Sequence, residues 1–160
     1  MLRQVSNYVE KIDKEEQQLM DDMLETMYAA NGIGLAAIQI GIPKRIIVMD
    51  ISKDEKKKEP RYFVNPVIKN KDSLKATYEE GCLSVPNQFA EIDRPKKCDV
   101  EYLDYYGEKK ILKAEGLLAT CIQHEMDHLE GILFIDYLSK LKKSMIIKKL
   151  SKIKSTRIVV

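Results

Sequence analysis

The only two histidines of the chain, His124 and His128, lie four residues apart in the segment QHEMDH. The surrounding run, residues 116–129, is largely apolar and is followed by Gly131, so it predicts a buried helix that stops there. On a helix this spacing places both imidazoles on one face, about one turn apart. Two neutral imidazoles in that position can bind one divalent metal ion, with Glu125 beside them as a general base.

The alternative is that these histidines are hydrogen-bonded core residues, because the H-E-x-x-H pattern also arises by chance. No histidine lies elsewhere in the chain. In addition, burying two imidazoles and a glutamate without polar partners costs free energy. We therefore favour a metal site on this helix over a structural pair of histidines.

Two histidines do not complete a catalytic metal site, which usually has three protein ligands and one open position. Cys121 is on the same predicted helix, but it is separated from His128 by about 10 Å at a rise of about 1.5 Å per residue. One ion cannot bind both, so the third ligand must come from another segment. The favoured candidate is Cys82, and Glu80 stands close to it in the sequence. Cys98 is expected to be a core residue in a strand.

Composition places the chain among ordinary globular proteins. It has 160 residues, 44% of them hydrophobic and 32% charged, with a net charge of +2, so we expect one domain over residues 1–160 and no DNA partner. No apolar run is long enough to span a bilayer, no signal-peptide core is visible, and three cysteines do not suggest a disulfide framework. We therefore expect a cytoplasmic protein without a membrane partner.

Periodicity predicts several further elements. A helix over residues 14–30 begins after Asp13, whose side chain can cap it, and a strand over 62–68 contains Pro66, which implies a sheet edge or a bulge. Other strands are expected over 45–49, 97–103 and 110–113. A basic amphipathic helix over about 139–154 is expected to place four apolar side chains on one face, namely Leu141, Met145, Ile146 and Leu150.

The segment GIGLAAIQIGIP, residues 32–43, imitates the glycine pattern of dinucleotide-binding proteins, and Asp50 imitates the acid that binds the ribose. That pattern requires a strand before the glycines and a long helix after them. Here a predicted helix precedes them, and a glycine and a proline interrupt the segment after them. We therefore interpret the glycines as positions where the backbone approaches a ligand closely. Gln39 is then either a polar group beside that edge or an ordinary exposed strand residue.

Three segments together resemble the motifs of peptide deformylases in order and spacing: GIGLAAIQ (32–39), EGCLS (80–84) and QHEMDH (123–128). The resemblance extends from about Leu2 to Leu150. It implies an α+β fold in which small antiparallel sheets pack around the central helix that carries HEMDH, with an N-terminal helix and a basic C-terminal helix. It also implies removal of the formyl group from the N-terminal formylmethionine of newly synthesised peptides, with release of formate, in a bacterial or organelle-derived protein.

The resemblance implies a ligand set as well, consisting of Cys82, His124 and His128. The ion would be Fe²⁺ in the cell, and Zn²⁺ or another divalent metal would be able to substitute, which fits a site of one sulfur and two nitrogens.

By the same resemblance, Glu125 acts as the general base and proton carrier. The Gln39 side-chain amide and the Leu83 backbone N–H would stabilise the oxyanion that develops at the formyl group. The residues implied for substrate binding are Ile33, Gly34, Glu80, Gly81, Leu117, Thr120 and Cys121.

Two other functions remain open, another H-E-x-x-H hydrolase such as a peptidase and an inactive metal-binding homologue. The family also suggests a contact between the basic C-terminal helix and the ribosome, where the alternative is a solvated lysine face. Members of the family carry additional residues before the segment that resembles residues 2–5. We therefore expect a sheet edge or part of the core to be less covered in this chain.

Overall fold

A computed structural model describes residues 2–52 and 56–159, with side chains described up to residue 150. This part of the chain contains two antiparallel sheets and three α-helices. The larger sheet has the order β1-β2-β3-β6-β7, formed by β1 (Gly34–Ala36), β2 (Ile46–Met49), β3 (Arg61–Lys69), β6 (Lys97–Leu103) and β7 (Lys109–Glu115). The smaller sheet is the hairpin of β4 (Lys75–Cys82) and β5 (Val85–Pro95).

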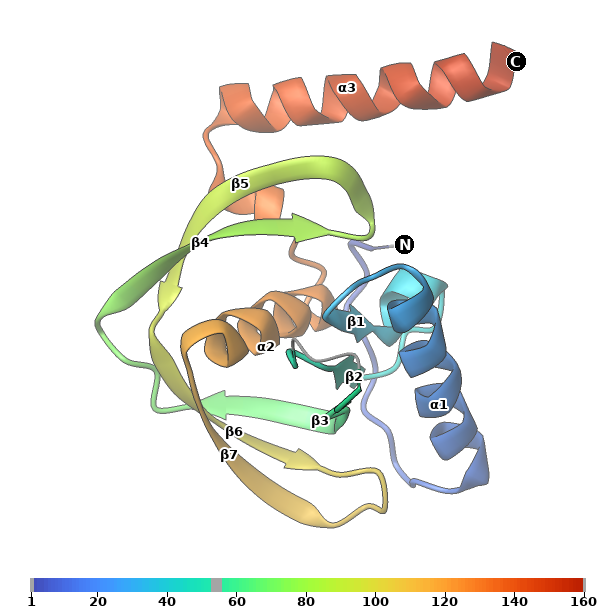
Figure 1. The fold of residues 1–160 in the computed structure, drawn as a ribbon, viewed down its shortest axis with the longest axis vertical. Coiled ribbons are helices and arrows are strands. Elements are labelled where there is room, and N and C mark those ends of the chain that lie inside the picture. Colours follow the sequence, from blue (N-terminus) through green and yellow to red (C-terminus); the bar gives the residue numbers. More distant parts are fainter. Residues whose placement is uncertain (1, 53–55, 160) are drawn as a thin grey trace.

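Helix α2 (Gly116–Leu129) lies between the two sheets, as predicted for the helix that carries HEMDH (Figure 1). It follows β7 directly at Gly116, which has a φ of 62°, a value that glycine adopts without steric cost. Its apolar side chains, among them Ile122 and Leu129, are buried in one cluster with Phe63 and Val100 of the larger sheet. The structure therefore confirms the predicted α+β fold with a central helix.

Helix α1 (Lys14–Ala29) has the predicted start, because the Asp13 side chain accepts a hydrogen bond from the Glu15 backbone N–H at 3.0 Å. Its methionine stripe, Met20, Met23 and Met27, is fully buried against β1 and β2. The 3₁₀ helix η1 (Ala37–Ile40) follows β1, so no long helix follows the glycines of residues 32–34. This order of elements agrees with the rejection of a dinucleotide-binding motif.

Of the two alternatives predicted at Pro66, a sheet edge or a bulge, β3 contains the bulge. Its register with β6 breaks between Val64 and Val67, and Asn65 has a φ of 49°. The Asn65 side chain accepts a hydrogen bond from the Val9 N–H at 2.8 Å and donates one to the Val9 carbonyl at 2.7 Å. The bulge thus binds the N-terminal segment to the sheet.

The β4–β5 hairpin has no counterpart among the predicted elements. One face of β4 is charged and exposed, and its sequence includes two consecutive glutamates and a glycine, residues that are uncommon in strands. The other face is buried by α2 and by the 3₁₀ helix η2 (Phe134–Tyr137). Tertiary packing therefore forms this hairpin where the local sequence does not indicate it.

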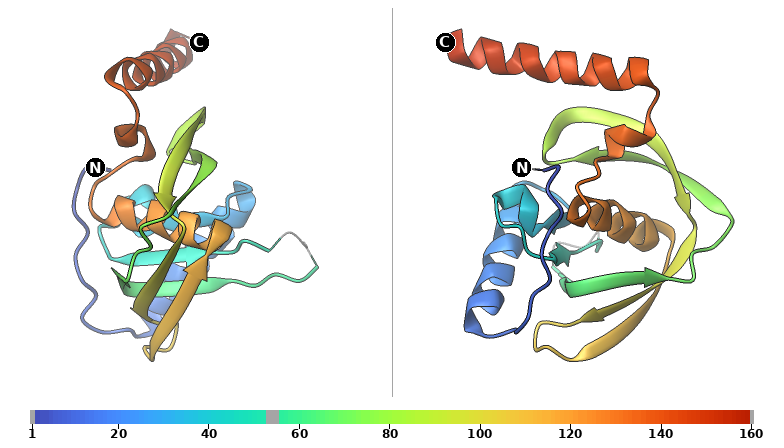
Figure 2. Two further views of the ribbon diagram at one scale, coloured as in Figure 1. Left: turned by 90° about the vertical axis from the view of Figure 1, so that its left-hand side faces the viewer. Right: turned by 180° about the vertical axis from the view of Figure 1, so that it is seen from behind.

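Helix α3 (Lys140–Val159) lies outside the body of the molecule and extends away from it (Figure 2). It begins within one residue of the predicted start and continues beyond residue 154. Ile146 is buried and Leu150 half-buried against the hairpin and η2. Leu141 and Met145, which the sequence analysis placed on the same face as these two residues, are 71% and 51% exposed, so packing covers only part of that apolar face. Among the described residues, no helix is long and apolar enough to cross a membrane.

Candidate functional site

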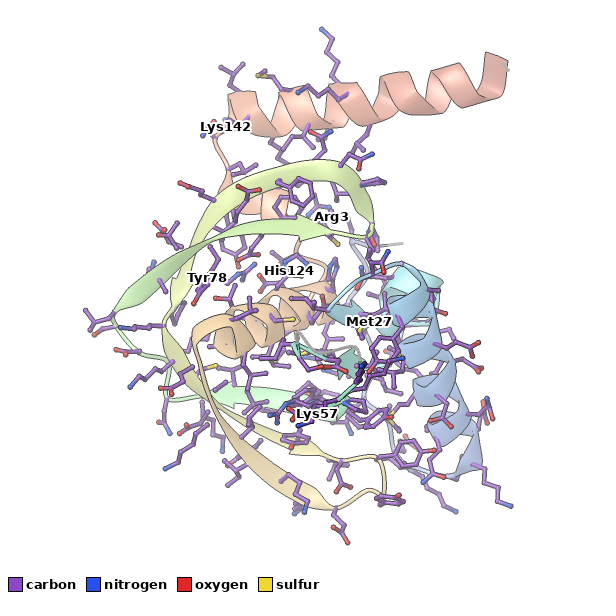
Figure 3. The ribbon with its side chains drawn as sticks, in the orientation of Figure 1. Arg3, Met27, Lys57, Tyr78, His124 and Lys142 are labelled. Carbon is purple, nitrogen blue, oxygen red and sulfur yellow. The ribbon has the colours of Figure 1, made fainter. Side chains whose placement is uncertain are left out.

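The ligand atoms of Cys82, His124 and His128 all lie within 4.8 Å of one another. Cys82 is the last residue of β4, and its Sγ is 3.3 Å from the Nε2 of His128. Both histidines of α2 contact residues of β4, His128 through Cys82 and His124 through Glu80, and His124 lies in the middle of the molecule (Figure 3). The structure thus brings together the three residues that the sequence analysis selected from two distant segments.

Burial and neighbouring groups shift the pKa values of the two imidazoles in opposite directions. Burial lowers the pKa of His128 to about 3, aided by the positive charge of His124, so this ring is neutral, the form that binds metal. Burial would also lower the pKa of His124, but hydrogen bonds with Cys82 and Glu80 raise it to about 10. The surroundings of His124 therefore favour positive charge, which a proton or a metal ion can supply.

Glu80 supports His124 from the side opposite the cluster. Its Oε1 lies 2.9 Å from the Nδ1 of His124, which leaves Nε2 available as a ligand atom. Arg94 donates two further hydrogen bonds to the same carboxylate, at 2.7 and 2.9 Å. Burial would raise the pKa of Glu80, but these bonds from His124 and Arg94 hold it below its usual value. Glu80 therefore lines the site as a charged partner of His124, and both oxygens of its carboxylate already have hydrogen-bond partners.

Arg94 also connects the site to two residues that the sequence analysis did not select. Its Nη1 donates to Asp127 at 2.8 Å, and its guanidinium lies 4.9 Å from the centre of the Tyr137 ring. The Tyr137 hydroxyl donates to the same Asp127 carboxylate at 2.7 Å. The only sequence signal for this role was the position of Arg94 two residues after Ile92, on the same inward face of a strand that had not been recognised.

Glu125 faces the cluster from α2. Its Oε1 is 3.9 Å from the Nε2 of His124, and its Oε2 is buried without a hydrogen-bond partner among the described residues. Burial raises the pKa of Glu125 to about 7, against the opposing charges of His124 and Arg94. A carboxyl group with a pKa near neutrality suits a general base. Gly34 packs against it so closely that a Cβ there would lie 3.1 Å from its Cγ.

Cys121 is the ligand candidate that sequence spacing rejected, and the structure supports the rejection. Its side chain lies beside Gly34 and the Ile33 carbonyl and is not part of the Cys82 cluster. Burial raises the pKa of the Cys121 thiol well above its usual value, so it remains protonated and uncharged.

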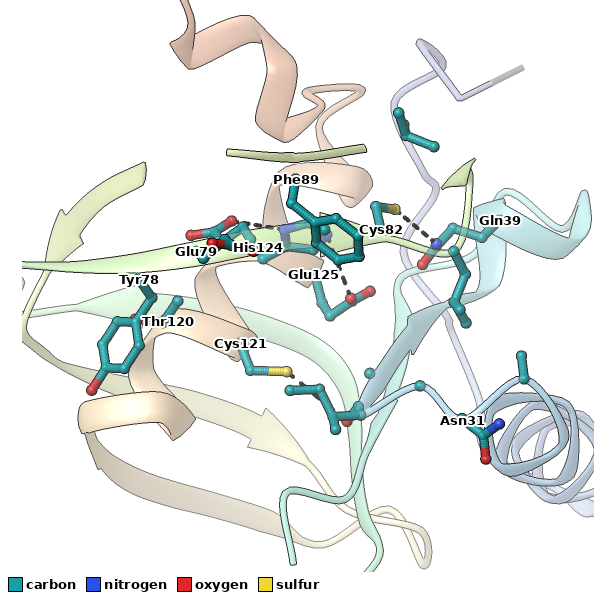
Figure 4. A pocket seen from close by; sticks show the side chains of 18 of the residues that line it. Asn31, Gln39, Tyr78, Glu79, Cys82, Phe89, Thr120, Cys121, His124 and Glu125 are labelled. Carbon is teal, nitrogen blue, oxygen red and sulfur yellow. Dashed lines mark hydrogen bonds and ion pairs between the residues drawn. The ribbon is translucent and has the colours of Figure 1, made fainter. Parts of the chain in front are cut away.

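Gln39 reaches the cluster from η1 and is not an exposed strand residue, which was the alternative interpretation. Its Oε1 accepts a hydrogen bond from the Ala36 N–H at 2.8 Å, and its Nε2 lies 3.4 Å from the Sγ of Cys82. The same Nε2 donates to the Ser84 hydroxyl at 3.0 Å, a contact that the sequence analysis missed. Because the oxygen is held by the backbone, the amide donor is directed into the site (Figure 4).

A pocket of about 510 Å³ opens beside this cluster, a size typical of ligand sites. Leu83, which is 39% exposed, lies at the turn of the hairpin and lines the pocket. All the residues predicted to bind substrate line it as well: Ile33, Gly34, Glu80, Gly81, Leu117, Thr120 and Cys121.

One edge of this pocket is the free edge of β1, which is the outermost strand of the larger sheet. The Ile33 carbonyl points toward the sheet, because it accepts a hydrogen bond from the Asp50 N–H at 2.9 Å. Successive residues of a strand direct their backbone groups to opposite edges, so the N–H and C=O of Gly34 face the pocket side.

Comparison with known proteins agrees with this geometry. The model of the family described as polypeptide deformylase matches residues 1–144. The chain belongs to the polypeptide deformylase family. A curated relative from Pelagibacter ubique, named peptide deformylase, is 79% identical over 160 residues, which are all of this chain and 93% of that protein.

Solved structures of the family agree in fold as well. A peptide deformylase from Ehrlichia chaffeensis superposes with a TM-score of 0.90 at 44% identity, over 96% of this chain and 90% of that one. The same organism's enzyme in complex with actinonin gives a TM-score of 0.88 at 47% identity, covering 94% and 90% of the two chains. The protein is thus a metal-dependent deformylase that acts on formylated peptides, and neither alternative, another hydrolase or an inactive homologue, is favoured.

Proposed function

We propose that Cys82, His124 and His128 bind one divalent ion and that the adjoining pocket accepts peptides that begin with N-formylmethionine. The observation that carries the proposal is the convergence of one sulfur and two imidazole nitrogens beside a buried carboxylate and a directed amide donor. The donor set suits Fe²⁺ or Zn²⁺, and the negative groups around His124 favour a cation there. Family similarity favours Fe²⁺ in the cell.

The ion would supply Lewis acidity, which makes water more acidic and polarises a carbonyl group. The chain's own residues carry the proton and the negative charge. The Glu125 carboxylate takes the proton from the attacking water and then delivers it to the departing amine. The Gln39 amide and the Leu83 backbone N–H donate hydrogen bonds to the oxygen of the formyl group as it becomes negatively charged.

Substrate binding uses the free edge of β1 and the pocket beside α2. The backbone of Ile33 and Gly34 holds the peptide as an added strand, with Gly34 providing the groups that face the pocket. The methionine side chain enters between Leu117, Thr120 and Cys121, whose protonated thiol presents no charge to it.

The decisive experiment combines metal analysis with two activity assays. Protein purified without oxygen should contain about one divalent ion per chain and should release formate from an N-formylmethionyl peptide, as expected for a three-ligand site. The same preparation should not cleave the peptide bond of the corresponding unformylated peptide. Cleavage of that bond without formate release, or protein that binds no metal, would contradict the proposal.

We also propose that the protein works in the cytoplasm and contacts the ribosome through α3. The exposed side chains of Lys142, Lys148 and Lys149 are on this helix, and residues 139–160 contain no acid, which suits a phosphate backbone. The exposed Leu141 and Met145 lie on the same helix.

Charge neutralisation tests this contact while the packing of Ile146 and Leu150 stays intact. Replacing Lys142, Lys148 and Lys149 with glutamine should abolish co-sedimentation with ribosomes at low salt. The matched control replaces three exposed lysines of β7, Lys109, Lys110 and Lys113, and should leave co-sedimentation unchanged. An equal effect of both triple variants would mean that α3 has no specific role.

A further inference from the structure

A second cavity, of about 580 Å³, shares no lining residue with the pocket described above. It opens where β3 and β6 separate, because the register between these strands ends at the pair of Val64 and Leu103. The start of β3 and the β6–β7 turn diverge from there, on the other side of α2 from the β4–β5 hairpin (Figure 1). The residues that line this cavity are Asp21, Pro60, Arg61, Tyr62, Tyr102, Asp104, Tyr105, Tyr106 and Lys110.

Tyrosine rings form one wall of this cavity. The Tyr105 ring lies with its centre 5.1 Å from the centres of the Tyr62 and Tyr106 rings. Its hydroxyl donates a hydrogen bond to the Oδ2 of Asp21 at 3.1 Å. Asp104 fixes the turn that carries these rings, because its Oδ1 accepts two backbone N–H bonds at 2.9 Å. The wall is therefore held in place before any ligand arrives, and its rings offer apolar faces to a planar group.

Two cations line the same cavity with little compensation. Arg61 is half-buried, and its guanidinium has no hydrogen-bond or ion-pair partner among the residues that the structure describes. Lys110 has only the exposed carboxylate of Glu108, at 3.7 Å. Withdrawing a charged group from water without a partner costs free energy. The unpaired guanidinium therefore indicates that an anion binds at this end of the cavity.

Both cations are on the face of the larger sheet that is directed toward α2. Phe63 and Tyr102 pack in the cluster of that face, with their ring centres 4.5 Å apart. Because side chains alternate along a strand, Arg61 projects to the same face as Phe63. Lys110 lies directly opposite Tyr102 across the β6–β7 pair, so it projects to that face as well.

The tyrosine wall is on the opposite face of the sheet. Tyr62 and Tyr105 pack in the cluster that includes the methionines of α1. Asp21, which belongs to α1, uses its Oδ2 for Tyr105 and leaves Oδ1 available to a donor. The cavity thus passes between the diverging strands and joins a basic end to an end with aromatic rings and a hydrogen-bond acceptor. A ligand that carries only one sign of charge would satisfy only one of these ends.

We propose that this cavity binds a purine nucleoside monophosphate. The base stacks on the rings of Tyr62 and Tyr105, and its exocyclic amino group donates a hydrogen bond to Asp21. The phosphate binds to Arg61 and Lys110. Stacking of a base on tyrosine and charge-assisted bonds from arginine to phosphate are common contacts of proteins with nucleotides. The volume is in the range of small-ligand sites. Binding here requires none of the residues proposed for deformylation.

Calorimetric titration of the metal-loaded enzyme tests the ligand class. AMP and GMP should each bind at about one per chain, as expected for a single cavity of this size. UMP, whose base has no exocyclic amino group, should bind about tenfold more weakly, because it loses a hydrogen bond to a charged acceptor. Inorganic phosphate that binds as tightly as AMP would show an adventitious anion site and overturn the proposal. A short oligoadenylate that binds more tightly than AMP would overturn the assignment to a free nucleotide.

Variants test the positions of the two ends. Arg61→Gln and Lys110→Gln should each weaken AMP binding by about tenfold, because each removes a charge-assisted bond to the phosphate, and should leave adenosine binding unchanged. The matched control is Lys97→Gln, since Lys97 is also a strand lysine beside an exposed glutamate, Glu115 at 3.6 Å, but lies outside the cavity. It should leave AMP binding unchanged, and no variant should alter the kcat of formate release. AMP binding that is absent from the wild-type enzyme, or undiminished in Arg61→Gln, would disprove this site while the proposed deformylase site stands.

Discussion

Helices α2 and α3 both combine apolar and charged residues, yet they differ in which of these residues are buried. In α2 the polar residues His124, Glu125 and His128 are buried. In α3 the apolar residues Leu141 and Met145 are exposed. The difference comes from the surroundings, since α2 has a sheet on each side, whereas α3 contacts the body mainly through Ile146 and Leu150.

The comparison shows that a buried polar residue is informative, because the free-energy cost of removing it from water must be compensated by a partner. Several polar groups of α2 have such compensation, as the contacts of His124 with Glu80 and of Asp127 with Arg94 illustrate, whereas the Nδ1 of His128 has no hydrogen-bond partner among the described residues. Exposure of an apolar residue costs less and needs no such partner. Four sets of variants sharpen this contrast between the two helices.

The largest effect is expected from Cys82→Ala, which removes the proposed ligand that comes from outside α2. The variant should lose its metal and its activity, because the remaining imidazoles leave the ion with too few protein ligands. The control is Cys98→Ala, which alters a buried cysteine of the core and should keep the metal. Metal content per chain, measured after anaerobic purification and desalting, checks both. Full metal content in Cys82→Ala would refute the ligand assignment.

Glu125→Ala should keep the metal but lose about 10²- to 10⁴-fold in kcat, the range typical of a general base. The matched change on α3, Lys148→Ala, should leave kcat and metal content unchanged, since that side chain is exposed. Formate release with a saturating N-formylmethionyl peptide measures the effect. An active Glu125→Ala variant would end the claim that this residue carries the proton.

Arg94→Met should lower the free energy of unfolding by about 3–5 kcal/mol, because it leaves the buried Glu80 and the half-buried Asp127 without their cation. The corresponding ion pair at α3, between Lys143 and Asp136, is more exposed, so Lys143→Met should cost about 0–1 kcal/mol. Urea unfolding of both variants gives the comparison. Equal losses would show that the network around α2 has no special energetic role.

The smallest effects concern α3 itself. Ile146→Ala should cost about 2 kcal/mol because it opens a cavity against the hairpin, whereas Leu141→Ala should change stability by less than about 0.5 kcal/mol. Thermal unfolding of the metal-loaded protein measures both changes. A larger loss in Leu141→Ala than in Ile146→Ala would mean that α3 packs through Leu141 and not through Ile146.

The sequence by itself determined the features that depend on neighbouring residues. The four-residue spacing of the histidines on one helix, the Asp13 cap and the strand irregularity at Pro66 are local consequences of helix and strand geometry, and the structure contains each of them. The rejection of Cys121 as a ligand followed in the same way from the rise of a helix.

Only the tertiary structure decided which residues from distant segments meet. It brought Cys82 to the histidines, turned the Gln39 amide toward that sulfur, and placed Arg94 between Glu80 and Asp127. It also decided which face of α3 is covered. These outcomes depend on how the hairpin and the larger sheet pack on α2, because a contact between segments far apart in the chain is not encoded in the periodicity of either segment alone.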